Sequence, residues 1–422
     1  MRNKIIKAIA VGLMLTMNLT ACGRGMTENR IITSQEQINE VIPLKLWGAQ
    51  EDHELLTYLI EGFKQQYADE AIFDITLEVR SEVECKSSIL QDVNAAPDIF
   101  IFPDDQLMTF ASAGVLEPIT YEEEIRTRNL EGAVEAASIN NKVYAYPLTA
   151  DNSYFMYYNK NYFSEEDVKS LDRMLEIAEQ HNKKIAMDMG NAWYLYSFFG
   201  NTGLTIGLND DYTTNYCTWN ATDGEIKGAD VVESLKKITS SKGFIDVGDT
   251  DFISGVQDGT IIAGINGVWN AVEVEKAWKE GYAATKLPTY TVAGKSVQMS
   301  SYVGYKVLGV NSRSKNVEWA ERLAEYLSNE QSQMERFKQR RQGPSNINAA
   351  NSEEVNESVA IAALLEQSEF SSVQRVGELY WKPVTELGQM ISKGDLKGMT
   401  NQQVIDRAVQ QITSKKVKED FK

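Results

Sequence analysis

An unbroken apolar run, Ile-Phe-Ile-Phe at residues 99–102, constrains the fold of this chain most strongly. Such a run is typical of a parallel strand that helices cover on both faces. Before it, residues 43–47 indicate a short strand, residues 54–67 keep a helical period, and residues 73–79 alternate as a half-buried strand does. This succession of strand and helix predicts an α/β lobe built from βαβ units.

A similar succession follows and predicts a second lobe. Its expected strands cover residues 154–158, 184–187 and 260–265, and its expected helices cover residues 193–199 and 229–240. A helix at residues 269–279, a strand at 302–310 and a helix at 317–327 are expected to follow along the chain. The run at residues 261–267 ends at Asn266-Gly267, which is a turn signal. Trp269 therefore stands just past a strand end, where an α/β protein forms its crevice.

Length and charge exclude some classes of protein. A chain of 422 residues is long enough for two or three domains with their own cores. A net charge of -18 disfavours a nucleic acid partner, because duplex binding requires a basic face.

The N-terminus carries an export signal. Arg2, Lys4 and Lys7 precede a short apolar core at residues 8–17, and the tetrad Leu-Thr-Ala-Cys ends at Cys22. The tetrad resembles the bacterial lipobox, which implies lipidation of Cys22; an ordinary signal peptide with a chance cysteine is the alternative. We therefore expect residues 1–21 to be a signal peptide and residues 22–42 a flexible tether.

Other residue types give little sign of catalysis or metal binding. His53 and His181 have no partner spacing for a catalytic triad or a metal site, and no glycine-rich phosphate loop is present. Cys85 and Cys217 could form one disulfide but not a disulfide framework; we expect both to be free and mostly buried. We predict no metal and no cofactor.

Several segments, in order along the chain, resemble the family 1 extracellular solute-binding proteins of ABC importers, and the maltodextrin-binding group most of all. They cover residues 44–47, 96–100 with 104–106, 113–118, 144–147 with 159–160, 266–269, and 380–381. The resemblance implies a type II periplasmic-binding-protein-like fold, in which each of two lobes is a mainly parallel sheet flanked by helices. Three hinge segments cross between the lobes, and ligand binds in the cleft between them.

The resemblance also implies boundaries. Lobe 1 is expected at residues 43–149 and 298–340, and lobe 2 at residues 150–297 and 341–422. Hinges of this kind absorb rigid-body closure around a ligand.

A sugar site requires flat aromatic rings for the C–H faces of a pyranose, and carboxylates or amides for its hydroxyls. By match to the family's motifs, the resemblance implies four stacking residues and four hydroxyl-binding residues: Trp193, Trp269, Tyr380 and Trp381, and Glu51, Asp105, Gln106 and Asp151. Alternative roles stay open, including core packing for Trp193 and Trp381, a helix cap for Asp105, a solvent-facing position for Glu51 and a hinge role for Asp151. We expect core packing for Trp47, Trp278, Trp319 and the tyrosines at 154, 157 and 158, and a position of Tyr154 facing the cleft is the alternative.

The sequence departs from the maltodextrin pattern at the hydroxyl-binding positions. Gln106 replaces the usual arginine, Asp151 replaces the usual glutamate, and no glutamate precedes Trp193. The resemblance therefore predicts an oligosaccharide ligand without carrying maltose itself over to this chain.

We expect a non-enzymatic, monomeric, extracytoplasmic lipoprotein that is anchored to the bacterial membrane by its N-terminal lipid and delivers sugar to the transmembrane subunits of an ABC permease. A surface sugar sensor and a glycosidase with two carboxylates are the alternatives. Asp104 and Asp105 are adjacent in sequence, so they are poorly placed to flank one glycosidic bond.

Overall fold

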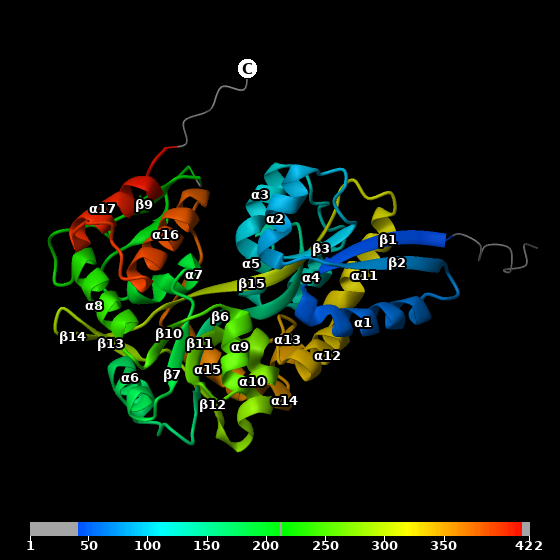
Figure 1. Cartoon of the computed structure of the whole chain (residues 1–422). Helices are drawn as coiled ribbons and strands as arrows, with labels where there is room; N and C mark the ends of the chain where they lie inside the picture. Colours follow the sequence, from blue (N-terminus) through cyan, green and yellow to red (C-terminus); the bar gives the residue numbers. More distant parts are fainter. Residues whose placement is uncertain (1–40, 212, 416–422) are drawn as a thin grey trace, which may run out of the picture.

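The computed structural model of the chain describes residues 41–211 and 213–415. Its elements form two lobes that meet along two long strands (Figure 1). The predicted signal peptide, Cys22 and most of the predicted tether lie outside the described residues. Within them, no helix combines the length and the hydropathy that a membrane crossing requires.

Lobe 1 contains the N-terminal strands and the helices that cover them. Strands β1 and β2 pair in parallel along their whole length, and β3 pairs in parallel with β1 on its other side. Buried residues of α1, β3 and α11, among them Leu55, Phe100 and Leu323, share one core. The elements are β1 (Val41–Gly48), α1 (His53–Gln66), β2 (Ile72–Val79), α2 (Glu82–Gln91), β3 (Ile99–Pro103), α3 (Leu107–Ser112), α4 (Glu122–Arg128), α5 (Glu131–Ala136), β4 (Ser138–Ile139), β5 (Lys142–Val143), α11 (Val317–Ser328) and α12 (Glu330–Arg340).

Lobe 2 has its own parallel strands, in the order β10-β7-β11, and two cores. Its strands are β7 (Lys184–Met187), β8 (Ile206–Leu208), β9 (Asn215–Cys217), β10 (Phe244–Asp246), β11 (Ile261–Gly267), β12 (Tyr282–Thr285), β13 (Thr289–Val292) and β14 (Lys295–Gln298). Its helices are α6 (Leu171–Gln180), α7 (Ala192–Leu195), α8 (Gly228–Ser240), α9 (Asp249–Gln257), α10 (Ala271–Trp278), α13 (Ile347–Ala350), α14 (Glu353–Asn356), α15 (Val359–Ser368), α16 (Trp381–Ser392) and α17 (Asn401–Ile412).

Strands β6 (Tyr146–Asn159) and β15 (Ser301–Val310) join the lobes into one ten-stranded sheet, and β16 (Ser371–Val373) pairs with β15. The first half of β6 pairs with β15, and its second half pairs with β11 of lobe 2. The chain after α12 runs beside β6, where the amide of Ala150 donates to the carbonyl oxygen of Gly343. Strand β6 is therefore hydrogen-bonded to both of the other crossing segments.

The sequence patterns predict the position of most elements, and β6 is an exception. The pattern predicts a strand only at residues 154–158, but the structure has one strand from Tyr146 to Asn159. The polar residues before residue 154 interrupt the apolar pattern. They nevertheless stay in the strand because Asn152 and Ser153 pair with Gly304 and Val303 of β15.

The predicted packing residues lie in the cores. Trp47, Trp278 and the tyrosines at 154, 157 and 158 are buried, and Trp319 packs against the lobe 1 core. Cys85 is buried, Cys217 is partly buried, and both are free, as predicted.

Candidate functional site

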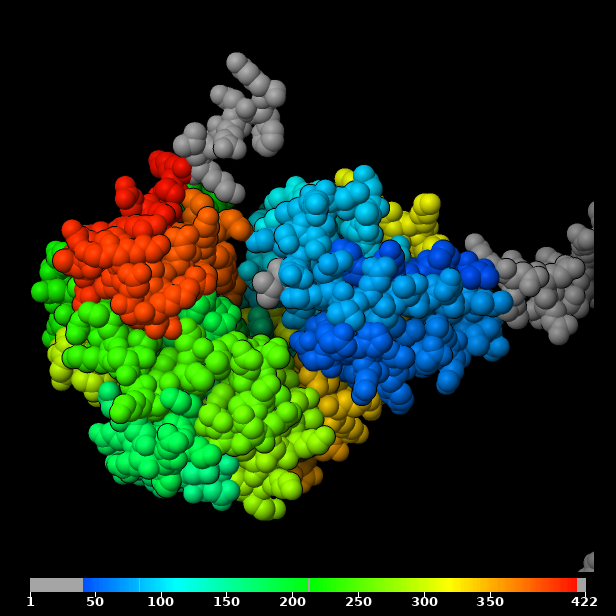
Figure 2. Space-filling model, in the orientation of Figure 1, coloured from blue at the N-terminus to red at the C-terminus, as the bar shows by residue number. Residues whose placement is uncertain are grey.

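A groove separates the two lobes on the face that Figure 2 shows. The orange and green surface of lobe 2 forms one wall, and the cyan surface of α2 and α3 in lobe 1 forms the other. The Nζ atom of Lys86 in α2 lies 2.7 Å from a carboxylate oxygen of Glu378, in the short helix η7 (Glu378–Tyr380) of lobe 2. This ion pair connects the walls, and it lies beside the predicted residues Tyr380 and Trp381.

Trp269 lies at the C-terminal end of β11, as predicted, in the short 3-10 helix η5 (Val268–Asn270). Its ring is partly exposed and folds back over the strand end. A Cβ atom at Gly267 would lie only 2.0 Å from that ring, so glycine is needed at this position for the observed orientation. The backbone carbonyl of Trp269 accepts a 3.1 Å hydrogen bond from Arg340 at the end of α12.

Trp193 lies against Trp269. The two ring centroids are 5.9 Å apart and the ring planes are inclined by 34°. Asn191 caps α7 by accepting a 3.0 Å hydrogen bond from the amide of Trp193, and the Tyr154 hydroxyl donates 2.8 Å to the Trp193 carbonyl. The structure therefore brings together two of the four predicted stacking residues and holds one of them by its backbone on both sides.

Trp381 and Tyr380 differ in exposure. Trp381 begins α16 and is partly exposed on the core that also supports Trp193 and Trp269. Tyr380 is fully buried, and its hydroxyl donates a 2.9 Å hydrogen bond to the carbonyl oxygen of Ala192. Direct stacking on a sugar was predicted for Tyr380. Its burial instead fits a supporting role, because the bond connects the start of α16 to the residue before Trp193.

The predicted hydroxyl-binding residues of lobe 1 lie in two short 3-10 helices, η1 (Gln50–Asp52) and η2 (Asp104–Gln106). Glu51 is exposed, Asp105 is partly exposed, and Gln106 is buried. Burial, together with the negative charge of Asp104, raises the pKa of Asp105 to about 7. The side chains of Asp105 and Gln106 do not cap a helix, because no side chain accepts a capping hydrogen bond at the start of η2 or of α3.

Asp151 lies where the crossing segments meet. Its carboxylate accepts a hydrogen bond from the backbone amide of Gly343, and burial raises its pKa to about 6. Only 1% of the residue is exposed, so Asp151 has the hinge position that the sequence analysis kept open beside ligand contact.

Lys306 of β15 was missed by the sequence analysis. Its Nζ atom forms a 2.9 Å ion pair with Glu82 at the start of α2 and lies 5.8 Å from the centroid of the Trp269 ring. The sequence contains one sign of this ion pair, which is a lysine inside the otherwise apolar strand expected at residues 302–310. A charge that is buried in a strand needs a partner of opposite charge.

A second missed contact involves Arg375, which follows β16. Its Nη1 atom lies 3.5 Å from a carboxylate oxygen of Asp104, and the same carboxylate accepts a 2.8 Å hydrogen bond from the amide of Tyr305. Asp104, the neighbour of the predicted Asp105, therefore anchors η2 to β15 and to the segment that leads to η7.

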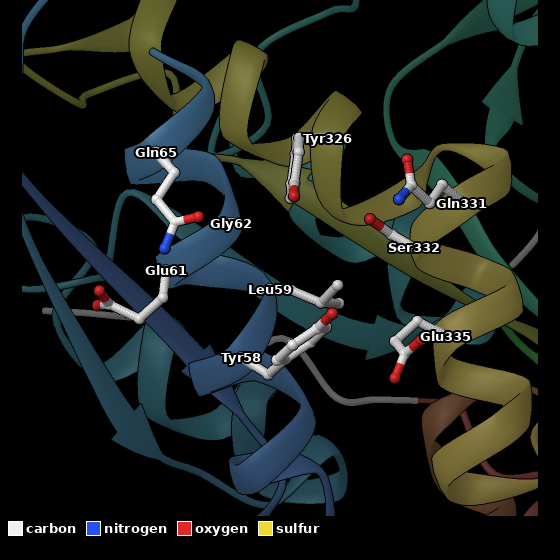
Figure 3. A pocket seen from close by; sticks show the side chains of 9 residues that line it. All are labelled: Tyr58, Leu59, Glu61, Gly62, Gln65, Tyr326, Gln331, Ser332 and Glu335. Carbon is white, nitrogen blue, oxygen red and sulfur yellow. The ribbon is translucent and has the colours of Figure 1, made fainter. Parts of the chain in front are cut away.

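A separate pocket of about 200 Å³ lies on lobe 1 between α1 and the end of α11 with α12 (Figure 3). Tyr58, Tyr326 and Glu335 are among its lining residues, and none of the predicted sugar-binding residues is. It is therefore distinct from the cluster around Trp269.

Comparison with known proteins decides the family. Residues 59–363 match a family model described as bacterial extracellular solute-binding protein. The chain belongs to this family. The predicted family is thereby confirmed.

Relatives within this solute-binding family are similar along nearly the whole chain. The galactooligosaccharide-binding protein of Bacillus subtilis (strain 168) is 25% identical over 408 residues, which are 90% of each chain. A maltooligosaccharide ABC transporter solute-binding lipoprotein of Streptococcus pneumoniae is 25% identical over 394 residues, or 87% of each chain. These relatives are named for binding and transport and not as enzymes, which agrees with the prediction of a non-enzymatic protein.

Solved structures agree with the fold. One structure, described as being with acarbose, is 28% identical with a TM-score of 0.80 and covers 89% of this chain and 99% of that chain. A maltodextrin-binding protein from L. casei BL23, without ligand, is 22% identical with a TM-score of 0.71 and covers 89% of this chain and 100% of that chain. The predicted two-lobed α/β fold is confirmed.

Proposed function

We propose that this solute-binding protein binds an oligosaccharide in the groove between its lobes and delivers it to the transmembrane subunits of an ABC permease. The observation that carries the proposal is the contact between the partly exposed rings of Trp193 and Trp269 at the end of β11. Adjacent flat rings suit the apolar faces of successive sugar units. The names of the relatives, which mention galactooligosaccharide and maltooligosaccharide, support the same class of ligand.

In this proposal the two lobes have different roles. Trp193, Trp269 and Trp381 stack on the sugar from lobe 2. Tyr380 supports α7 through the hydrogen bond from its hydroxyl group to the carbonyl oxygen of Ala192. Glu51, Asp105 and Gln106 bind hydroxyl groups from lobe 1, because charged and amide oxygens make directional hydrogen bonds to them. Asp151 acts at the hinge. Ligand that contacts both lobes favours the closed form by its differential affinity for that form.

We further propose that Cys22 carries a lipid and anchors a monomeric protein to the outer face of the bacterial membrane. The lipobox-like tetrad before Cys22 supports this proposal, as does the lipoprotein named among the relatives. Cys22→Ala in the producing cell tests it: the variant should be released into the medium, whereas the parent chain stays with the membrane fraction.

A thermal-shift screen of the purified full chain tests sugar binding. Maltotetraose and galactotetraose are the probes, and mannitol is the control. Ligand that binds only the folded state stabilises it by RT ln(1 + [L]/Kd), so an oligosaccharide at about 100 times its Kd adds about 2.7 kcal/mol. A melting temperature that neither tetrasaccharide raises would contradict the proposal. Release of shorter sugars during the incubation would favour the hydrolase alternative.

A further inference from the structure

Lys306 occupies a central and almost enclosed position. In β15 it pairs with Pro103 of β3 on one side and with Thr149 of β6 on the other. Its side chain is 8% exposed and that of its ion-pair partner Glu82 is 12% exposed. A lysine placed so deep keeps its charge because Glu82 lies 2.9 Å away and the carboxylates of Asp52 and Asp151 also act on it.

The ammonium group of Lys306 also reaches the opposite lobe. It lies over the ring of Trp269, with Nζ 5.8 Å from the ring centroid. A cation over an indole face is attracted by the negative π surface, and the attraction strengthens where water is excluded. One side chain therefore connects the carboxylate of Glu82 in α2 with the aromatic ring that follows β11.

Two acceptors beside this ion pair have no donor. Among the described residues, the Oε1 atoms of Glu82 and Gln106 are buried without a hydrogen-bond partner. The side-chain nitrogen of Gln106 donates a 3.1 Å hydrogen bond to the backbone carbonyl of Glu82, which holds the Gln106 side chain against the start of α2. Buried acceptors without a donor are costly, so they mark a place where a ligand hydroxyl group would be favoured.

We propose that Glu82 and Lys306 are specificity-determining residues of the sugar site: Lys306 positions Trp269 across the groove, and the free oxygens of Glu82 and Gln106 accept hydroxyl groups of the sugar. This inference rests on the proposed function. It also commits to a neutral oligosaccharide, since Glu82 already compensates the charge of Lys306 and further carboxylates lie close by.

Calorimetric titration of the full chain with maltotetraose and galactotetraose tests the proposal, using whichever of the two the parent chain binds more tightly. Lys306→Met should weaken binding about tenfold or more, because both the ion pair and the contact with the indole are lost. Lys306→Arg keeps a cation that can pair with Glu82 and stack on the indole, so it should weaken binding less than Lys306→Met does. Lys295→Met, which breaks the exposed pair of Lys295 with Glu225, is the matched control and should leave affinity unchanged.

A double-mutant cycle separates positioning from a general structural effect. If Lys306 acts through Trp269, Lys306→Met should weaken binding far less in a Trp269→Ala background than in the parent chain. The melting temperature without ligand reports folding. Should Lys306→Met fail to fold, the whole cycle is measured in a Glu82→Gln background, where Glu82 carries no charge and its loss is common to all four variants.

The outcomes separate the two proposals. A parent chain that binds neither tetrasaccharide overturns the proposed function itself. A parent chain that binds, with Lys306→Met within twofold of it or with fully additive effects in the cycle, overturns only the role of Lys306. Tight binding of an oligogalacturonate would overturn the commitment to a neutral sugar.

Discussion

The hydroxyl group of Tyr380 donates a 2.9 Å hydrogen bond to the carbonyl oxygen of Ala192, the residue before Trp193. Tyr380 and Ala192 are 188 positions apart in sequence, so the bond fixes the start of α16 to the short helix α7. Trp193 and Trp381 thereby share one support.

Tyr380→Phe should lower the free energy of unfolding by about 1 kcal/mol, the usual value of one buried hydrogen bond. It should also weaken oligosaccharide binding, because α7 loses a contact that holds Trp193. Tyr290→Phe is the matched control: Tyr290 is equally enclosed, and its hydroxyl donates to the carbonyl oxygen of Phe198. Urea denaturation and calorimetry report the two quantities. Equal losses of affinity in both variants would show that the Tyr380 bond has no special role.

Gly267→Ala should weaken sugar binding with little cost in stability. The new Cβ atom would lie 2.0 Å from the Trp269 ring, and because this ring is partly exposed, it can swing outward. We expect a loss of affinity of about tenfold and a change in unfolding free energy below about 1 kcal/mol. Gly248→Ala is the control, since its nearest contact is 3.9 Å away. Tryptophan fluorescence measured with and without sugar would detect the displaced ring; an unchanged spectrum would contradict the prediction.

The strand before Trp269 was predictable because it is encoded locally. Residues 261–267 carry an apolar run and a turn signal, and the structure places β11 there with every residue buried. The short range of these signals also explains why the order of strands and helices could be read along most of the chain.

The Glu82–Lys306 pair was not predictable in the same way. Its members come from α2 and β15 and meet only because β15 inserts next to β3 in the sheet. Lys86 and Glu378, which form the ion pair across the groove, also come from distant parts of the chain, 292 positions apart. Tyr380 shows a different limit: a motif match names a residue but does not reveal that its ring is buried.

Arg336→Met should destabilise the protein by about 3–5 kcal/mol at pH 7, because it leaves the buried carboxylate of Asp52 without its closest cation. Arg336 and Asp52 are each 1% exposed, and the guanidinium group also donates 2.8 Å to Gln342. Arg322→Met removes two exposed ion pairs, with Glu70 and Glu318, and should cost less than about 1 kcal/mol.

The same variant gives a pH test. Burial alone would raise the pKa of Asp52, but Arg336, with Lys306 and Arg340, more than offsets it, so the pKa is lowered on folding. This carboxylate therefore stabilises the parent chain at neutral pH, and that contribution is lost as the pH falls through the lowered pKa. In Arg336→Met, Asp52 keeps only the longer 3.4 Å ion pair with Arg340, and protonation of Asp52 relieves part of the cost of its buried charge. The stability gap between variant and parent should narrow between pH 7 and pH 4, and a constant gap would contradict this account.

Asp105→Asn should stabilise the protein at pH 8. Burial and the charge of Asp104 raise the pKa of Asp105 to about 7, above its ordinary value in the unfolded chain. The folded state then binds more protons than the unfolded state, so the contribution of this group to stability falls as the pH rises towards 7. Because Asp105 is partly exposed, we expect a gain of only about 1–2 kcal/mol at pH 8 and almost none at pH 4. Urea denaturation at both pH values, with the exposed Asp69→Asn as control, should show the gain for Asp105 alone.

Trp269→Ala should weaken oligosaccharide binding by an order of magnitude or more, since stacking in a desolvated site adds about 1 kcal/mol beyond the area that is buried. Trp319→Ala is a close control: Trp319 is also partly buried, and the guanidinium carbon of Arg322 lies 4.6 Å from its ring centroid, much as Lys306 lies over Trp269. Both variants lose an indole and a cation–π contact, but only Trp269 touches Trp193. Calorimetric titration with the tetrasaccharide that the parent chain binds should therefore show a large loss for Trp269→Ala and none for Trp319→Ala. If both variants bind the sugar as tightly as the parent chain does, Trp269 is not part of the binding site.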